Sequence, residues 1–451
     1  MALVYHREVF CKKQEMYIVE KSNLVNKKFN YTWVIVSLCF LSVMVSLGFC
    51  SSGRTLYLTA ITEALNIPRG AFSLNDTFRF ITTTVVNLFF GSLVARFGTK
   101  KLICAGFLCL IAFSVINSVA ESIYVFYLGG IFLGVGLSWT GTTMVSVIIN
   151  KWCTKNKGTI TGAVLAANGV GGAISVQILS PIIFKEGTAF GYRDSYHVVT
   201  AVLVVTLLIF VLFYREKRTE GDNDPSTYAK KRKVRGAGWV GMDYTEGRKK
   251  AYLYIAMLCM FFTGMVLQGI GGITVPYMYD LKFDIEFVAL FSSLSSIIMI
   301  FTKFLSGFLF DRFGMRITMN ISFVSAFISM FSLIFLTNSA LGKVLVFSRM
   351  IFGAIALPLE TVMLPLFARE IFGNKSFEKF VGLFVSASTA GFAVGAPFAN
   401  VTYDIFGSYK VAFAVFAVLM LFVTIAMQYV AYASGKDRKR IIREYTEEQT
   451  A

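Results

Sequence analysis

Long runs of apolar residues, separated by short polar segments, fill the chain from Tyr31 to near Val430. A helix of about 18 or more apolar residues is long enough to cross the ~30 Å hydrocarbon core of a bilayer. The pattern predicts twelve such spans, at residues 32–59, 72–95, 101–120, 123–149, 158–184, 196–214, 251–277, 286–310, 317–337, 343–368, 378–403 and 410–433. We therefore expect an all-α membrane protein in which most of the chain is embedded.

One long polar segment, residues 215–250, divides six predicted spans from six. It predicts a cytoplasmic N-terminal tail at 1–31, a six-helix bundle at 32–214, a cytoplasmic linker at 215–250, a second six-helix bundle at 251–433 and a cytoplasmic tail at 434–451. The linker is rich in charged residues, so we interpret it as a flexible, solvated topology anchor near anionic lipid headgroups. A docking site for a specific partner is the less favoured alternative.

The composition agrees with a membrane protein, and the distribution of charge gives its orientation. Hydrophobic residues make up 56% of the chain and charged residues 15%, whereas soluble domains have ~25% charged residues. Most of the 43 Lys and Arg residues fall in the tails, the linker and alternate loops. This asymmetry predicts a multi-pass protein of the plasma (inner) membrane with both termini cytoplasmic, and it explains the net charge of +17 without nucleic-acid binding.

Little in the sequence indicates a metal, a cofactor or an enzyme. The seven cysteines form no C-x-x-C pair and there are two histidines, so we expect no structural disulfide, no metal site and no cofactor. Neither G-x-S-x-G nor H-E-x-x-H occurs. The first apolar run is too long for a signal peptide and lacks a small-residue cleavage site, so we interpret it as a retained span.

A loop sequence occurs twice, offset by 216 residues: Gly91-Ser-Leu-Val-Ala95-Arg96-Phe97-Gly98, and Gly307-Phe-Leu-Phe-Asp311-Arg312-Phe313-Gly314-Met-Arg316. Phe190-Gly191 and Phe406-Gly407 repeat the same offset. Each loop predicts a tight cytoplasmic turn, in which glycine supplies the permissive backbone and the basic residues hold the loop inside. Asp311 beside Arg312 can bridge to a neighbouring helix and latch the cytoplasmic face. The candidate gating residues are Gly91, Arg96, Gly98, Gly307, Asp311, Arg312, Gly314 and Arg316.

The pattern G-x-x-x-D-R-x-G-x-R resembles the signature loop of the major facilitator superfamily, and the resemblance covers nearly the whole chain. It implies two pseudo-symmetric six-helix bundles with substrate bound near the midplane. The first copy departs from the pattern, with Ala95 where Asp is usual. Small residues fill spans five and eleven, where we expect close crossing between the bundles; ordinary membrane packing is the alternative.

Three features are similar to the monocarboxylate transporter and oxalate:formate antiporter group. Arg54 lies in a segment of span one where monocarboxylate carriers place a cation, and Lys303 stands four residues before Gly307, as a substrate-binding arginine does in that group. The third is the basic, aromatic loop Asn150-Lys151-Trp152-Cys153-Thr-Lys155-Asn-Lys157-Gly158. The resemblance implies alternating-access transport of a small mono- or dicarboxylate.

Ionisable side chains inside spans are costly unless they face a cavity or a partner, so each is a functional candidate. We predict substrate contact for Lys303, with snorkelling or a structural ion pair as the alternative. Arg54 is a second candidate, although it lies near enough to the surface to snorkel outward. Tyr57, one turn beyond Arg54, completes this part of the predicted pocket. Two cations in one pocket would complement a carboxylate or a dicarboxylate.

Span ten carries Arg349 and Glu360, eleven residues apart and nearly on one helical face, which we expect to line the cleft. Met299 stands where proton-coupled monocarboxylate carriers place an aspartate, so proton coupling would depend on Glu360. Three modes of transport stay open: the substrate moves together with a proton, in exchange for a counter-anion, or alone. Asp76 and Arg79 are expected to form a local, structural pair.

We therefore predict a secondary transporter that moves a small organic anion and is a monomer. An efflux carrier for lipophilic or other small solutes is the alternative, although spans one and four lack the acids that such a carrier should need. A membrane enzyme lacks a catalytic constellation. A non-transport sensor would normally need a folded output domain, for which the linker is too short.

Overall fold

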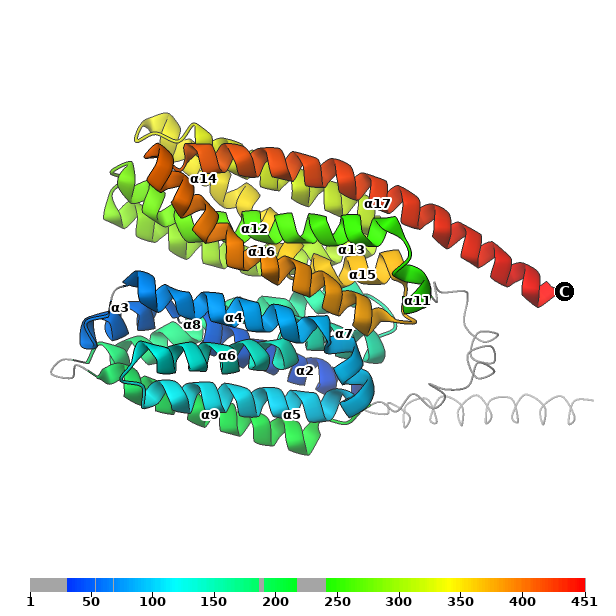
Figure 1. Ribbon diagram of the computed structural model, residues 1–451, viewed down its shortest axis with the longest axis horizontal. Coiled ribbons are helices and arrows are strands. Elements are labelled where there is room, and N and C mark those ends of the chain that lie inside the picture. Colours follow the sequence, from blue (N-terminus) through cyan, green and yellow to red (C-terminus); the bar gives the residue numbers. More distant parts are fainter. Residues whose placement is uncertain (1–30, 53, 68, 186–189, 217–240, 451) are drawn as a thin grey trace, which may run out of the picture.

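A computed structural model describes residues 31–450, apart from residues 53, 68, 186–189 and 217–240. The side chains of some further residues, Arg54 among them, also lie outside the described part. The described chain forms two helical bundles that lie side by side, one from each half of the sequence (Figure 1). This architecture confirms the predicted fold class.

The first bundle contains six membrane crossings in the described residues. Its elements are α2 (Tyr31–Val43), a π-helical stretch (Met44–Ser52) and α3 (Arg54–Ala64), followed by α4 (Arg69–Leu88), α5 (Phe90–Ser118), α6 (Ile123–Thr140), α7 (Thr142–Trp152), α8 (Lys157–Ile183) and α9 (Gly191–Phe213). Helix α2 and the π-helical stretch form the first crossing. Helices α6 and α7 meet at Gly141 and together form the fourth.

The second bundle repeats this plan. Its elements are α11 (Tyr244–Gly247), α12 (Ala251–Asp280), α13 (Ile285–Ile334), α14 (Ala340–Ala356), a 3-10 turn (Leu357–Glu360), α15 (Met363–Phe372), α16 (Phe377–Phe406) and α17 (Lys410–Thr450). Within the described residues, ten segments are long and apolar enough to cross a membrane. The bend in α13 divides one of these into two spans, and the more polar α4 completes the twelve.

The two predicted glycine turns have the expected backbone. Gly98 has φ 78° and ψ 166°, and Gly314 has φ 78° and ψ 178°. Residues with a Cβ rarely adopt this conformation, so glycine is required where consecutive helices meet. The internal repeat extends to the flanking side chains, because Arg96 lies over the Phe97 ring at 5.3 Å and Arg312 over the Phe313 ring at 5.6 Å.

Span ten, which the sequence presented as one helix, is broken. Pro358 lies in the 3-10 turn between α14 and α15, and Thr361 follows with φ −127° and ψ −70°. Proline removes a backbone donor and favours such an interruption. The expectation of a continuous helix is therefore wrong, and the argument that placed Arg349 and Glu360 on one face loses its basis.

The start of α2, the end of α9 and the far end of α17 lie on one face of the molecule (Figure 1), which we call the tail face. The hydroxyl of Tyr31, at the start of α2, donates to the carbonyl of Phe213, at the end of α9. The far end of α17 projects from the same face of the molecule (Figure 1). Asp437 near that end pairs with Lys250 at 2.8 Å, before the start of α12.

Both ends of the predicted linker are docked on the protein. Glu216 accepts hydrogen bonds from the backbone N–H of Thr99 at 2.7 Å and from its hydroxyl at 3.1 Å. At the other end, the N–H of Met242 donates to the carbonyl of Phe372 at 3.0 Å. The flexible-linker prediction for the intervening residues 217–240 lies outside the described chain.

Close helix crossings join the bundles from the tail face inward. A Cβ on Gly307 would lie 2.1 Å from the carbonyl oxygen of Gly158, and one on Gly162 would lie 2.5 Å from that of Lys303. Helices α8 and α13 therefore approach as the small-residue pattern predicted.

The second seam between the bundles lies along α4 and α16. The hydroxyls of Thr84 and Thr389 are hydrogen-bonded at 2.9 Å, and the rings of Phe80 and Phe392 meet edge to face at 5.4 Å. Helix α5 adds to this seam at Gly91, where a Cβ would lie 2.7 Å from the backbone nitrogen of Lys379. The molecule is closed on the tail face by these two seams.

Candidate substrate and coupling site

Lys303 lies in the first half of α13 and is 3% exposed. Its backbone packs against Gly162 of α8, at the seam between the two bundles. Its ammonium group forms no ion pair or hydrogen bond with the described residues, yet it interacts electrostatically with Glu360. Lys303 is therefore a buried cation that has the acid Glu360 nearby but does not form an ion pair with it.

Glu360 ends the 3-10 turn that interrupts span ten. Its Oε2 atom and the hydroxyl of the next residue, Thr361, are buried and have no hydrogen-bond partner among the residues that the structure describes. Interrupted membrane helices expose polar groups at the depth where carriers bind substrates and ions. The break therefore contains a buried hydroxyl next to a buried carboxylate, and the carboxylate interacts electrostatically with Lys303.

Sequence reasoning identified Lys303 and Glu360 separately and did not predict that they interact. The two residues belong to spans eight and ten, and their meeting depends on how α13 packs against the 3-10 turn. Pro358 was the available signal for a break in span ten. A helix break beside an unusual acid is the feature that could have directed attention to this position.

The other predicted substrate residues lie in different surroundings. Arg349 lies against Gly353, one turn later, where a Cβ would lie 1.7 Å from the Nη1 atom of Arg349. The buried Nε of Arg349 has no hydrogen-bond partner in the described part of the chain. Tyr57 stacks on Tyr196 with ring centroids 4.3 Å apart and is hydrogen-bonded to Ser195 at 2.8 Å, inside the first bundle. The side chain of Arg54 lies outside the described residues. Substrate contact by these three residues stays a prediction.

Arg79 of the first bundle, for which the sequence predicted a local, structural ion pair, lies beside the seam between the bundles. Arg79 forms the predicted ion pair with Asp76 at 2.9 Å. It also donates to the hydroxyl of Ser51, in the π-helical stretch, at 2.9 Å, and its guanidinium lies 4.2 Å from the centroid of the Phe80 ring. Because Phe80 contacts the second bundle, Arg79 is coupled to the seam in a way that the local i,i+3 spacing did not show.

Asp311 connects the two bundles on the tail face. Its carboxylate accepts hydrogen bonds from the N–H of Gly158 at 3.0 Å and of Thr159 at 2.7 Å, and from the Thr159 hydroxyl at 2.9 Å. These donors lie at the start of α8, where free N–H groups and the helix dipole favour an acid. One bundle therefore caps a helix of the other, as expected for a bridge from Asp311 to a neighbouring helix. A role of this residue in gating stays a prediction.

The first copy of the loop closes the opposite seam differently. Ala95 replaces the acid, and the bundles are held there by the packing of Gly91 on α16 and by an ion pair between Lys151 and Glu378 at 3.3 Å. The remaining candidate Arg316 donates weakly to the carbonyl of Ala431, at 3.5 Å. The two latches are thus related by the repeat but differ in chemistry.

Comparison with known proteins agrees with this geometry. The sequence pattern of the Major Facilitator Superfamily matches residues 38–337 and 256–444. The structure of the proton:xylose symporter XylE superposes with a TM-score of 0.68 at 15% identity, covering 89% of this chain and 96% of that one. At that identity the likeness concerns the fold.

Two relatives from Bacillus subtilis (strain 168) match part of the sequence. The uncharacterized MFS-type transporter YcxA is 23% identical over 249 residues, which cover 55% of this chain and 58% of YcxA. A nitrite extrusion protein is 25% identical over 156 residues, covering 35% of this chain and 38% of the relative. The chain thus spans less than two thirds of either relative. The twelve crossings, the repeated loop and the sequence match together show that the chain belongs to the Major Facilitator Superfamily of secondary transporters, which are carriers and not enzymes.

Proposed function

We propose that the protein carries a small organic anion, a mono- or dicarboxylate, across the plasma membrane by alternating access, with its tail face in the cytoplasm. The observation that carries the proposal is the buried ammonium of Lys303, which has no ion pair or hydrogen bond among the described residues. A cation in the membrane interior needs a compensating charge. A travelling carboxylate supplies that charge during part of the cycle.

Charge balance suggests how a proton is coupled to the anion. In the empty site, Lys303 and an ionised Glu360 sum to zero net charge. When Glu360 takes a proton and a carboxylate binds Lys303, the sum is again zero. The half-loaded states carry a net charge in a medium of low dielectric, where an uncompensated charge is costly. Only the empty and the fully loaded carrier should reorient readily, which makes anion and proton move together.

A small inorganic anion is the second candidate, because one relative is a nitrite extrusion protein. Nitrite resembles a carboxylate in having two oxygens that share one negative charge, so the same lysine could bind either anion. Efflux of lipophilic compounds receives no support from a site whose distinguishing feature is a buried charge pair. Substrate panels should therefore contain carboxylates and nitrite together.

The test is uptake by the purified protein in proteoliposomes, with formate, pyruvate, oxalate, succinate and nitrite as probes and an imposed pH gradient. Wild type should accumulate at least one carboxylate. Lys303→Ala removes a charged partner, whose loss costs about 1.5–3 kcal/mol, so uptake should fall about tenfold or more. Lys303→Arg should retain more activity than Lys303→Ala because it keeps the charge.

Lys410→Ala is the matched control, since Lys410 is an exposed lysine at the start of α17. Its uptake should equal that of wild type. Full carboxylate uptake by Lys303→Ala would remove this lysine from the binding site. Uptake of nitrite without any carboxylate would replace the organic anion by the inorganic one.

A further inference from the structure

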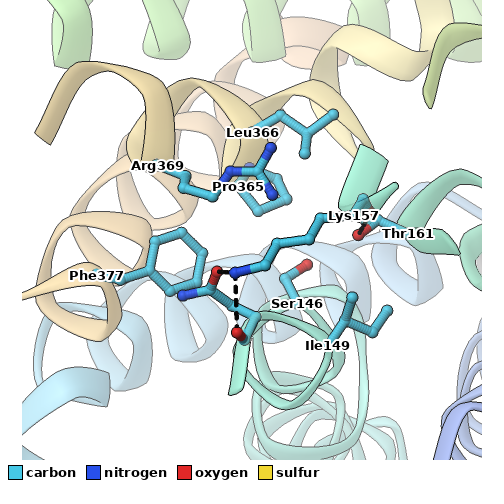
Figure 2. A pocket seen from close by; sticks show the side chains of 9 residues that line it. Ser146, Ile149, Lys157, Thr161, Pro365, Leu366, Arg369 and Phe377 are labelled. Carbon is cyan, nitrogen blue, oxygen red and sulfur yellow. Dashed lines mark hydrogen bonds between the residues drawn. The ribbon is translucent and has the colours of Figure 1, made fainter. Parts of the chain in front are cut away.

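Cationic side chains are frequent on the tail face, and several of them are held by the protein itself. Lys157 donates from its ammonium to the carbonyl and side-chain oxygens of Asn150, at 3.0 and 2.6 Å, in a small pocket between the bundles (Figure 2). Lys151 pairs with Glu378 across the seam at 3.3 Å. The end of α17 that extends beyond the bundle, residues 433–443, has cations in different surroundings.

One side of this end of α17 is docked on the second bundle. Asp437 pairs with Lys250 at 2.8 Å and accepts a hydrogen bond from the hydroxyl of Tyr252 at 3.3 Å. The next residue, Arg438, is ion-paired with Glu370 of α15. These contacts fix the rotation of the helix about its axis, so its opposite side faces away from the protein.

The opposite side of α17 carries one row of side chains whose chemistry changes along the helix. At 3.6 residues per turn, Ile425, Tyr429, Tyr432, Lys436 and Lys439 fall within an arc of about 80°. All five side chains are exposed. The row, which we call the α17 stripe, thus passes from an apolar residue through two tyrosines to two lysines.

The tyrosines of the stripe mark the level at which α17 leaves the hydrocarbon core of the membrane. Helix α17 begins at Lys410, and about 33 Å of helix separates this residue from Tyr432, close to the ~30 Å thickness of the core. Exposed tyrosines are typical of the interface that follows. Lys436 and Lys439 lie about 6 and 10 Å beyond Tyr432 along the helix. Their side chains lean back toward the start of the helix, which places the ammonium groups at the level of the lipid headgroups.

The positive charge of the two lysines is not balanced within the described protein. Neither Lys436 nor Lys439 forms a hydrogen bond or an ion pair with the described residues. No Asp or Glu occurs three or four positions before or after either lysine, the spacings at which side chains meet on a helix. Arg443, one turn after Lys439, is also exposed and extends the stripe. The acids within residues 444–448 follow it, farther along the helix from the tyrosines.

We propose that Lys436, Lys439 and Arg443 bind the headgroup of an anionic phospholipid, such as phosphatidylglycerol, on the tail face. Clusters of basic residues just outside a membrane helix attract anionic lipids. The lipid phosphate reaches the lysines while the acyl chains lie along Ile425 and the tyrosines, so a lipid complements the whole stripe and a soluble anion only its charged part. Because the other side of the segment is docked on α12 and α15, a bound lipid connects the second bundle to the membrane surface. This site is separate from the transport site and does not depend on which solute is carried.

The first experiment measures the melting temperature of the full-length protein in detergent while phosphatidylglycerol or phosphatidylcholine with the same acyl chains is added. Phosphatidylglycerol should raise the melting temperature of wild type more, because a ligand stabilises the state that it binds. Each cation near an anionic surface contributes about fivefold to affinity. The double variant Lys436→Gln with Lys439→Gln should therefore need about 25-fold more phosphatidylglycerol for the same rise. Arginine at both positions keeps the charge and should preserve the response.

Lys155→Gln with Lys410→Gln is the matched control, since it removes two exposed lysines away from the basic end of the stripe. It should respond as wild type does. Glycerol 3-phosphate carries the phosphate without acyl chains and should produce no rise at the same concentrations; an equal rise would assign the cations to a soluble anion instead. Equal responses of wild type to both lipids would overturn the proposal, as would an unchanged response of the Lys436→Gln with Lys439→Gln variant.

A second experiment detects the lipid beside the cations directly. Ile442 is exposed on the same side of α17, and a bimane dye is attached at Ile442→Cys in a protein whose other cysteines are replaced. In nanodiscs, nitroxide-labelled phosphatidylglycerol should quench the dye more strongly than equally labelled phosphatidylcholine, because it is enriched at the site. The preference should disappear when Lys436 and Lys439 are changed to glutamine. A dye at Val418→Cys, exposed on the same side within the membrane, should show no preference, and equal quenching by both lipids at Ile442→Cys would contradict the lipid site.

Discussion

Few charged side chains are buried within the spans, and the proposed function depends on two of them, Lys303 and Glu360. Lys303 and Glu360 lie close enough to interact, and neither is fixed to the other by an ion pair. A proton on Glu360 changes the net charge of the site by one, as does a bound carboxylate. In the proposed cycle, protonation and carboxylate binding are therefore energetically linked, because both change the charge around Lys303.

Glu360→Gln tests this link, because glutamine imitates the protonated acid and cannot release a proton. We expect the variant to exchange substrate across the membrane by counterflow while a pH gradient no longer drives accumulation. The measurement is uptake in proteoliposomes with and without the gradient, beside counterflow in preloaded vesicles. Glu286→Gln, at an exposed acid in the first turn of α13, should behave as wild type. Gradient-driven accumulation by Glu360→Gln would exclude this carboxylate as the coupling group.

At this scale the sequence indicated which residues are unusual but not how they combine. Lys303 and Glu360 stand out because charges are rare within apolar runs. Their interaction joins positions 57 residues apart and depends on tertiary packing, which spacing along a helix cannot show. Tyr57 shows that closeness in sequence can also mislead. Its position one turn beyond Arg54 suggested a shared pocket, whereas its ring and hydroxyl have partners within the first bundle.

At the level of secondary structure, the turns at the repeated glycines could be predicted from the sequence, whereas the irregular stretches within helices could not. Gly98 and Gly314 occur at matched positions in two loops, and both have positive φ. The π-helical stretch at Met44–Ser52 leaves no pattern in an apolar run, since it changes the hydrogen bonding and not the composition. The break at Pro358 had a signal, but the surrounding hydrophobicity continues through it.

The glycine turns give a stability prediction. Gly314 has φ 78° and ψ 178°, a region that alanine enters at a cost of about 1–3 kcal/mol. Gly314→Ala should therefore lower the melting temperature in detergent. Gly98→Ala should lower it as well, because its Cβ would also lie 2.8 Å from Glu216 Oε1. The control is Gly271→Ala, at a helical glycine with nothing near its missing Cβ; an equal loss there would show that the turn conformation is not the cause.

The whole molecule is two copies of one plan held together asymmetrically. Its division into two similar bundles was predictable from the repeated loops, and so was the difference between Ala95 and Asp311. The conformation was not predictable, because a carrier sequence must allow more than one arrangement of its bundles. In this one, the seams along α8 with α13 and along α4 with α16 close the tail face.

Removing the stronger latch should shift the balance between these arrangements. In Asp311→Asn the carboxylate that caps α8 loses its charge, and a charged cap of this kind is worth about 1–2 kcal/mol. The ratio of closed to open tail face should therefore fall by about 5–30-fold. Spin labels at Lys155→Cys and Lys375→Cys, two exposed positions on tail-face loops of opposite bundles, would show this as a gain of the longer distance between the labels.

The other latch provides the comparison for this experiment. Glu378→Gln breaks the ion pair with Lys151, whose side chains are 33% and 24% exposed for Lys151 and Glu378. Partly exposed pairs contribute about 0–1 kcal/mol, so the distance distribution should change less than in Asp311→Asn. If Glu378→Gln opens the tail face as much as Asp311→Asn, the two latches are equivalent despite Ala95. An unchanged distribution in Asp311→Asn would mean that helix packing alone, through the glycines of α8 and α13, holds the bundles together on this face.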